Sequence, residues 1–143
     1  MIGLIVFLLT ACLPAGLLPA QGSSPRLSDK DVRNLMKNLS QDSKTFANNF
    51  KKAVERSTIR KTSREKEAKQ LADRFVQQTE GLGRQFERTK KADAELPVIY
   101  KSVKQLDALM QELSIQGVAA SNFTKVKTEL DEIAKQFSFT PSS

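Results

Sequence analysis

The amino-acid sequence predicts an all-α protein, an antiparallel up-down-up-down four-helix bundle with a longer first hairpin. The chain has 143 residues, enough for one domain but not for two substantial cores. Proline and glycine beyond residue 25 are limited to Gly81, Gly83, Pro97, Gly117 and Pro141, so the frequent turns of an all-β fold are missing. Four stretches between residues 28 and 137 repeat apolar residues at the spacing of an amphipathic helix.

The N-terminal segment has the pattern of an export signal. The first 20 residues carry no charged side chain and begin with an apolar run. A segment of this length could cross a bilayer. Pro14, Gly16 and Pro19 interrupt its second half, however, which is typical of a signal peptide over residues 1–20. We therefore expect an exported protein, periplasmic or secreted, with residues 21–27 as a flexible linker.

Two processing sites compete, and an uncleaved anchor is a third alternative. Cleavage after Ala20 follows the pattern of a signal-peptidase site, with a small residue before the cut. Leu9-Thr10-Ala11-Cys12 instead matches a bacterial lipobox. The signal would then be residues 1–11, and a lipidated Cys12 would anchor the protein to the membrane. If the segment is discarded, Cys12 is only a small apolar residue within it.

The first helix is predicted to begin at Ser28. Its hydroxyl can accept a first-turn N–H group, and Asp29 and Asp31 favour the positive end of the helix dipole. The core positions follow a heptad spacing over about 30 residues. They are Val32, Met36, Leu39, Ser43, Phe46, Phe50, Ala53 and Ser57. Residues 58–63 break the spacing and end the helix.

The second helix is predicted to be capped by Ser63 and to run for about 28 residues. Its core positions are Ala68, Leu71, Phe75, Gln78, Leu82 and Phe86. Gly81 and Gly83 lie inside this helix, where each costs about 1 kcal/mol relative to alanine. They indicate either a locally weakened helix or a hinge with a close backbone approach.

The third and fourth helices are shorter, at ~20 and ~17 residues. The third begins within residues 93–97, because Pro97 is tolerated only in a first turn, and ends near Gly117. Ser121 is predicted to cap the fourth, and residues 138–143 are expected to fray. The core positions are Leu96, Ile99, Val103, Leu106, Met110 and Leu113 in the third helix, and Phe123, Val126, Leu130, Ile133 and Phe137 in the fourth.

Helices joined by short links pack as antiparallel neighbours, so residues 28–137 form the bundle. From the unequal lengths, the first hairpin should project beyond the second by about 10–15 Å, at the loop around residues 57–63. Residues expected to be buried against one another across helices are Phe46, Phe50, Phe75, Phe86, Leu106, Leu130 and Phe137.

The stretch Arg26-Leu27-Ser28-Asp29-Lys30-Asp31-Val32, directly after the apolar segment, resembles the opening of a group of small exported bacterial all-helical proteins of uncharacterised function. Members of that group have about four helices and end in a short apolar-aromatic segment, here Gln136-Phe137-Ser138-Phe139. They often carry a tryptophan at the start of the last helix, where this chain has Phe123. The resemblance implies a bacterial, exported setting and no particular activity.

Most catalytic and cofactor chemistry needs residue types that this chain lacks. It contains no histidine, and its one cysteine is Cys12. Ser–His–Asp triads, Cys–His pairs, His/Cys zinc sites and the Glu-x-x-His motifs of di-metal bundles are therefore excluded. Carboxylates are the exception: Glu129, Asp131 and Glu132 form the densest acidic group, which we interpret as a solvated helix face. We predict a protein that is not an enzyme and that needs no cofactor or metal.

The net charge of +7 is concentrated in the first hairpin, where residues 27–91 hold 17 basic and 9 acidic side chains. Such an excess favours contact with an anionic surface, either phospholipid, an envelope glycan or an acidic protein, although a solvated surface is the alternative. Nucleic acid is the least favoured partner, because the loop has Ile59 but no aromatic side chain for base stacking. Membrane contact would be peripheral or through a lipid anchor. The candidate contact residues are Arg56, Arg60, Lys61, Arg64, Lys66 and Lys69.

The leading hypothesis is a non-enzymatic envelope or secreted interaction protein that contacts an anionic surface through this basic hairpin tip. A periplasmic holdase-type chaperone is the first alternative, since a basic protein with a polar cavity between long helices would attract unfolded acidic chains. A carboxylate-based hydrolase is the second, and it requires two facing acids in a cleft.

Overall fold

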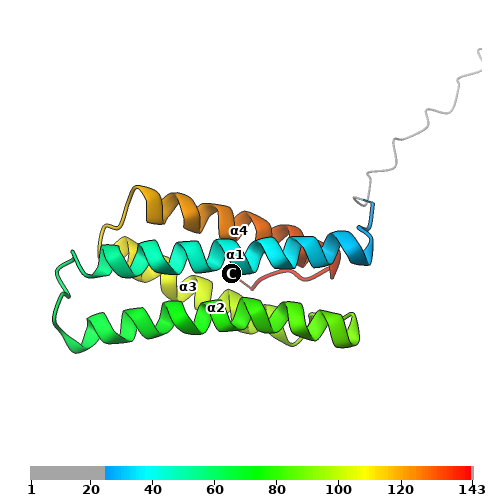
Figure 1. Ribbon diagram of the computed structural model, residues 1–143, viewed down its shortest axis with the longest axis horizontal. Coiled ribbons are helices and arrows are strands. Elements are labelled where there is room, and N and C mark those ends of the chain that lie inside the picture. The colour runs from blue at the N-terminus through cyan, green and yellow to red at the C-terminus, as the bar shows by residue number, and fades with distance from the viewer. Residues whose placement is uncertain (1–24, 143) are drawn as a thin grey trace, which may run out of the picture.

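The computed structural model describes residues 25–142, and within that range the chain forms four helices and no strand. They are α1 (Asp29–Val54), α2 (Ser63–Thr89), α3 (Glu95–Glu112) and α4 (Val118–Gln136). Figure 1 shows them side by side, each antiparallel to the next. The all-α bundle predicted from the sequence is confirmed. The predicted signal peptide and Cys12 lie outside the described residues.

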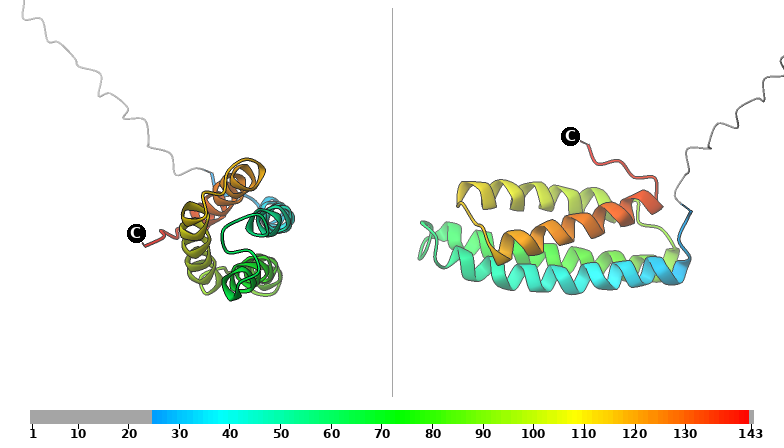
Figure 2. Two further views of the ribbon diagram at one scale, coloured as in Figure 1. Left: turned by 90° about the vertical axis from the view of Figure 1, so that its left-hand side faces the viewer. Right: turned by 90° about the horizontal axis from the view of Figure 1, so that it is seen from above.

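The helices form a ring around one core, as the end-on view in Figure 2 shows. α1 and α2 pair most strongly, α1 also contacts α4, and α2 contacts α3. The central aromatic cluster is built on Phe46 of α1. Its ring centroid lies 5.5 Å from Phe50, 6.3 Å from Phe75 and 4.8 Å from Phe123. Aromatic side chains from α1, α2 and α4 therefore meet in one cluster and hold these helices together.

The start of α1 is as predicted. The Ser28 hydroxyl accepts the Asp31 backbone N–H at 3.2 Å, and Asp29 and Asp31 lie in the first turn. The predicted core positions are buried from Val32 to Phe50. The next buried residue is Val54 rather than Ala53. An α-helix has 3.6 residues per turn, so a strict heptad drifts by about 20° per repeat and the seam passes to a neighbouring position.

Two predicted helix starts are wrong. Thr62, not Ser63, precedes α2, and its side chain makes no capping hydrogen bond. The Glu65 carboxylate accepts the backbone N–H of Lys61 instead, which secures the entry to α2. α4 begins at Val118 after Gly117, so Ser121 lies inside its first turn and donates its N–H to the Gly117 carbonyl at 3.0 Å.

The predicted end of the third helix is also wrong. α3 stops at Glu112, and Ser114 rather than Gly117 takes the left-handed conformation with φ of 51°. The Ile115 N–H then donates to the Met110 carbonyl at 2.9 Å, the closing bond of a Schellman motif. A serine occupies the position where glycine is usual, which is why the sequence pattern pointed elsewhere.

Six of the seven residues predicted to be buried between helices are buried. Phe137 is the exception, because it is half-buried and its ring packs edge-on against Phe86 at 5.8 Å. The other six are fully or almost fully buried: Phe46, Phe50, Phe75, Phe86, Leu106 and Leu130.

The segment after α4 returns along the bundle. Phe139 stacks on Tyr100 of α3 with centroids 5.5 Å apart, and Lys104 donates to the Ser142 carbonyl. These contacts involve Phe139 and Ser142, which belong to the segment that the sequence predicts to fray. Within residues 25–142, no helix is both long and apolar enough to span a bilayer.

Candidate anionic-surface contact site

The loop between α1 and α2, residues 55–62, forms one tip of the molecule. Figure 2 shows it lying farther out along the bundle than the connection between α3 and α4. Successive turn hydrogen bonds shape it, among them Arg60 N–H to the Ser57 carbonyl at 3.2 Å. Ile59 is buried and fastens the loop to the core. The turn hydrogen bonds and the buried Ile59 thus fix the backbone that carries the basic side chains of the loop.

Two of the six predicted contact residues are already paired with carboxylates. Arg64 binds Glu112 of α3 with Nη1–Oε1 2.7 Å and Nη2–Oε2 2.9 Å, a two-pronged ion pair. This contact raises the pKa of Arg64 and lowers the pKa of Glu112. Lys69 lies 2.7 Å from both Glu55 and Glu65. Their hydrogen bonds raise the pKa of Lys69, so its charge is used within the protein.

Three other cations share one hollow. Arg56, Arg60 and Lys61 line a space of about 630 Å³ together with Glu55 and Glu65. All three basic side chains are exposed, and none has an ion pair within the described part of the chain. The two carboxylates are held by Lys69 on α2. The five lining side chains carry three positive and two negative charges, and Lys69 adds one positive charge, so the hollow and its support have a net charge of about +2.

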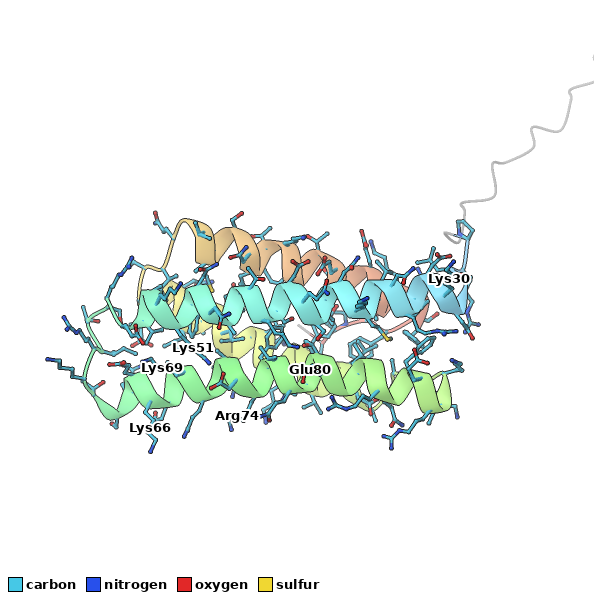
Figure 3. All side chains as sticks on the ribbon, in the orientation of Figure 1. Lys30, Lys51, Lys66, Lys69, Arg74 and Glu80 are labelled. Atoms are coloured by element: carbon cyan, nitrogen blue, oxygen red, sulfur yellow. The ribbon has the colours of Figure 1, made fainter. Side chains whose placement is uncertain are left out.

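Lys66 stands apart from this hollow. It is exposed on α2, and in Figure 3 its side chain projects away from α1. The structure thus divides the six predicted residues into an available trio, an isolated Lys66, and the internally paired Arg64 and Lys69. Sequence spacing could not separate these groups, since Glu112 lies 48 positions beyond Arg64.

A second polar cluster joins α1 to α4, and the sequence pattern indicated only half of it. Lys125 binds Asp42 at 2.8 Å, and Glu129 lies beside them with its buried Oε2 unpartnered within residues 25–142. Burial and the adjacent Asp42 carboxylate raise the pKa of Glu129 to about 7. Burial acts to raise the pKa of Asp42, but the hydrogen bonds to Lys125 and Glu129, together with the charge of Lys125, outweigh burial and lower this pKa. Two acids therefore face each other at a helix interface.

Neither Asp42 nor Glu129 lines the hollow at the tip, and Asp42 already forms an ion pair with Lys125. No group of three or more Asp, Glu, Cys or His side chains in the described range is placed to hold a metal ion. The chain matches no protein-family model, no curated protein and no solved structure. The functional argument therefore rests on the geometry and charge of the bundle itself.

Proposed function

We propose that this is an exported, non-enzymatic interaction protein that contacts an anionic surface through the hollow of Arg56, Arg60 and Lys61. The observation that carries the proposal is the position of these three cations. They are exposed, adjacent and unpaired within the described residues, at the outermost end of the longer hairpin. Arg64 and Lys69, by contrast, are held in ion pairs within the bundle.

The chemistry of the hollow favours phosphate-bearing surfaces. The planar guanidinium groups of Arg56 and Arg60 suit phosphate oxygens, which they can bind through two parallel hydrogen bonds. Each Lys or Arg near an anionic membrane contributes about 1 kcal/mol, and salt screens that attraction. Three such residues therefore supply about a hundred-fold in affinity. Phospholipid head groups and phosphorylated envelope glycans share this chemistry.

Vesicle binding tests the proposal. We compare the wild type with Arg56→Gln/Arg60→Gln/Lys61→Asn, using vesicles of phosphatidylglycerol and phosphatidylcholine and vesicles of phosphatidylcholine alone. Asparagine is chosen at Lys61 because that residue has φ of 62°, which asparagine tolerates. We expect the tip variant to bind the anionic vesicles about a hundred-fold more weakly, with an unchanged unfolding midpoint.

The matched control removes the same number of charges elsewhere. Lys30, Arg74 and Lys101 are exposed and have no ion pair within the described residues. Figure 3 shows Lys30 at the end of the bundle opposite the tip and Arg74 along α2. Lys30→Gln/Arg74→Gln/Lys101→Gln should weaken binding far less than the tip variant does. Equal losses for the two triple variants would mean that only net charge matters and would refute a contact at the tip.

A further inference from the structure

A second hollow lies between α1 and α2, away from the tip. It has a volume of about 490 Å³, within the range of small-molecule sites. Gly83 belongs to its lining, with the almost fully buried Met36 beneath it, and Ser40 and Gln41 add hydroxyl and amide groups. Glu80, labelled in Figure 3, marks its position along α2. The hollow thus combines an apolar patch with hydrogen-bonding groups on two helices.

Gly83 is not required by the packing of these helices. A Cβ atom built on it would meet only the Met36 Cβ, at 4.0 Å, which is ordinary van der Waals contact. Its backbone is helical, so no left-handed conformation demands glycine. Glycine inside a helix is nevertheless unfavourable relative to alanine. The missing side chain at Gly83 therefore leaves the hollow open without being required by the packing.

The charges around the hollow are unbalanced. Its two carboxylates are occupied, because Arg33 lies 3.6 Å from Glu87 and Lys44 lies 2.7 Å from Glu80. Arg84 reaches Glu80 only at 3.9 Å. Lys37 has no ion pair within residues 25–142 and comes from the opposite helix. Lys37 and Arg84 thus offer positive charge from both walls.

We propose that this α1–α2 hollow binds a small organic anion with an apolar body. The backbone at Gly83 and the aliphatic stems of the lining Lys and Arg side chains would contact the apolar part, and Lys37 and Arg84 would bind the acid group. The site shares no residue with the tip hollow, so it is independent of the proposed surface contact.

The probe is anilinonaphthalene sulfonate, which joins an apolar ring system to one anion and fluoresces when bound. N-Phenylnaphthylamine, its neutral analogue, reports apolar binding without the charge. The purified protein should bind the sulfonate saturably at one site and the neutral probe at least about ten-fold more weakly, the value of one well-placed charge contact. The lack of tryptophan leaves the fluorescence signal free of interference from that residue. Absence of saturable binding would overturn the proposal.

The two helix glycines provide matched variants. Gly83→Gln places a side chain in the hollow, whereas Gly81→Gln lies in the lining of a different groove, between α2 and α3. Both replace a helical glycine, so both should raise the unfolding midpoint. Only Gly83→Gln should weaken sulfonate binding, by about ten-fold or more. Equal affinities for the two variants would contradict the site.

Charge variants locate the anion. Lys37→Gln/Arg84→Gln should reduce affinity for the sulfonate but leave affinity for the neutral probe unchanged. The tip variant Arg56→Gln/Arg60→Gln/Lys61→Asn should bind the sulfonate as the wild type does. If the tip variant alone loses the sulfonate, the probe is bound at the tip and the α1–α2 hollow is not its site.

Discussion

At the scale of single residues, four of the five positive-φ positions within residues 25–142 are not glycine, and Gly117, with φ of 71°, is the fifth. Lys61, Lys90, Ser114 and Ser138 all have positive φ without being glycine. Gly81 and Gly83 instead lie within α2. Helix ends usually place glycine at the left-handed position, because other residues pay a steric penalty there. Sequence reasoning therefore placed the end of α3 at the wrong residue, near Gly117 rather than at Glu112.

The first expectation follows from this arrangement. Gly81→Ala should raise the free energy of unfolding by about 1 kcal/mol, because a Cβ at position 81 meets only the end of the Arg84 side chain, at 3.9 Å. Ser114→Gly should also stabilise, by relieving the positive φ at the end of α3. Urea unfolding with an unchanged slope measures both effects. A lower midpoint for Gly81→Ala would mean that α2 needs the glycine as a hinge.

The second expectation concerns the acid pair between α1 and α4. The pKa of Glu129 rises from its ordinary 4.5 to about 7, so the folded protein retains a proton that the unfolded chain releases. The free energy of unfolding must then fall as pH rises from 4.5 to 7. Asp42 acts in the opposite direction, since its lowered pKa contributes stability above pH 3.8 that is lost on further acidification.

Glu129→Gln removes the first of these effects. Near pH 8 it should stabilise the protein by on the order of 1 kcal/mol, after discounting for the partial exposure of this carboxyl, and near pH 5 it should change little. Urea unfolding of both proteins at the two pH values tests this. Lys125 and Glu132 also act on Glu129, so the control is Glu67→Gln, an exposed carboxyl of α2 that does not act on the pair. Identical pH dependence in wild type and Glu129→Gln would show that Glu129 titrates normally.

At the scale of helices, apolar spacing was sufficient to predict all four elements and most of their buried faces. It predicted Val32 to Phe50 of α1 correctly, because burial of a helix face follows its period. It did not reveal that Arg64 pairs with α3 or that Asp42 meets Glu129. Those contacts depend on how helices distant in sequence are brought together, which periodicity within one helix does not encode. Charge counting therefore located the tip but overcounted its available cations.

The third expectation tests the shared core. Phe50 is fully buried, so Phe50→Ala should lower the free energy of unfolding by about 3–5 kcal/mol. Phe137 is half-buried and packs only at the edge of Phe86, so Phe137→Ala should cost less than half as much. Thermal or urea unfolding of both variants gives the comparison. Equal losses would contradict the assignment of the core.

At the scale of the whole molecule, the bundle carries its positive charge on one hairpin. Residues 27–91 hold a net charge of +8. Residues 92–143 are net negative at −2 and Arg26 adds one positive charge, which gives the total of +7. Long-range attraction would therefore orient the first hairpin toward an anionic surface. Under the proposed function, the tip hollow would then provide the local contact.

The fourth expectation concerns export. Export would determine the compartment in which the protein meets an anionic surface. Mass spectrometry of the protein from its native host should show that the N-terminal segment has been removed. A start at Gln21 would support cleavage by signal peptidase, and a lipidated Cys12 would support the anchored form. An intact Met1 would contradict the predicted export signal.

The most direct measurement places an environment-sensitive fluorophore at the tip and follows it on anionic vesicles. With Cys12→Ser the chain has no cysteine, so Thr58→Cys labels the tip and Ala94→Cys labels the opposite end of the bundle. We expect a blue shift at position 58 on phosphatidylglycerol vesicles, reversed by raising salt, and little change at position 94. Equal shifts at the two positions, or no salt-sensitive shift at position 58, would contradict an anionic contact through the tip.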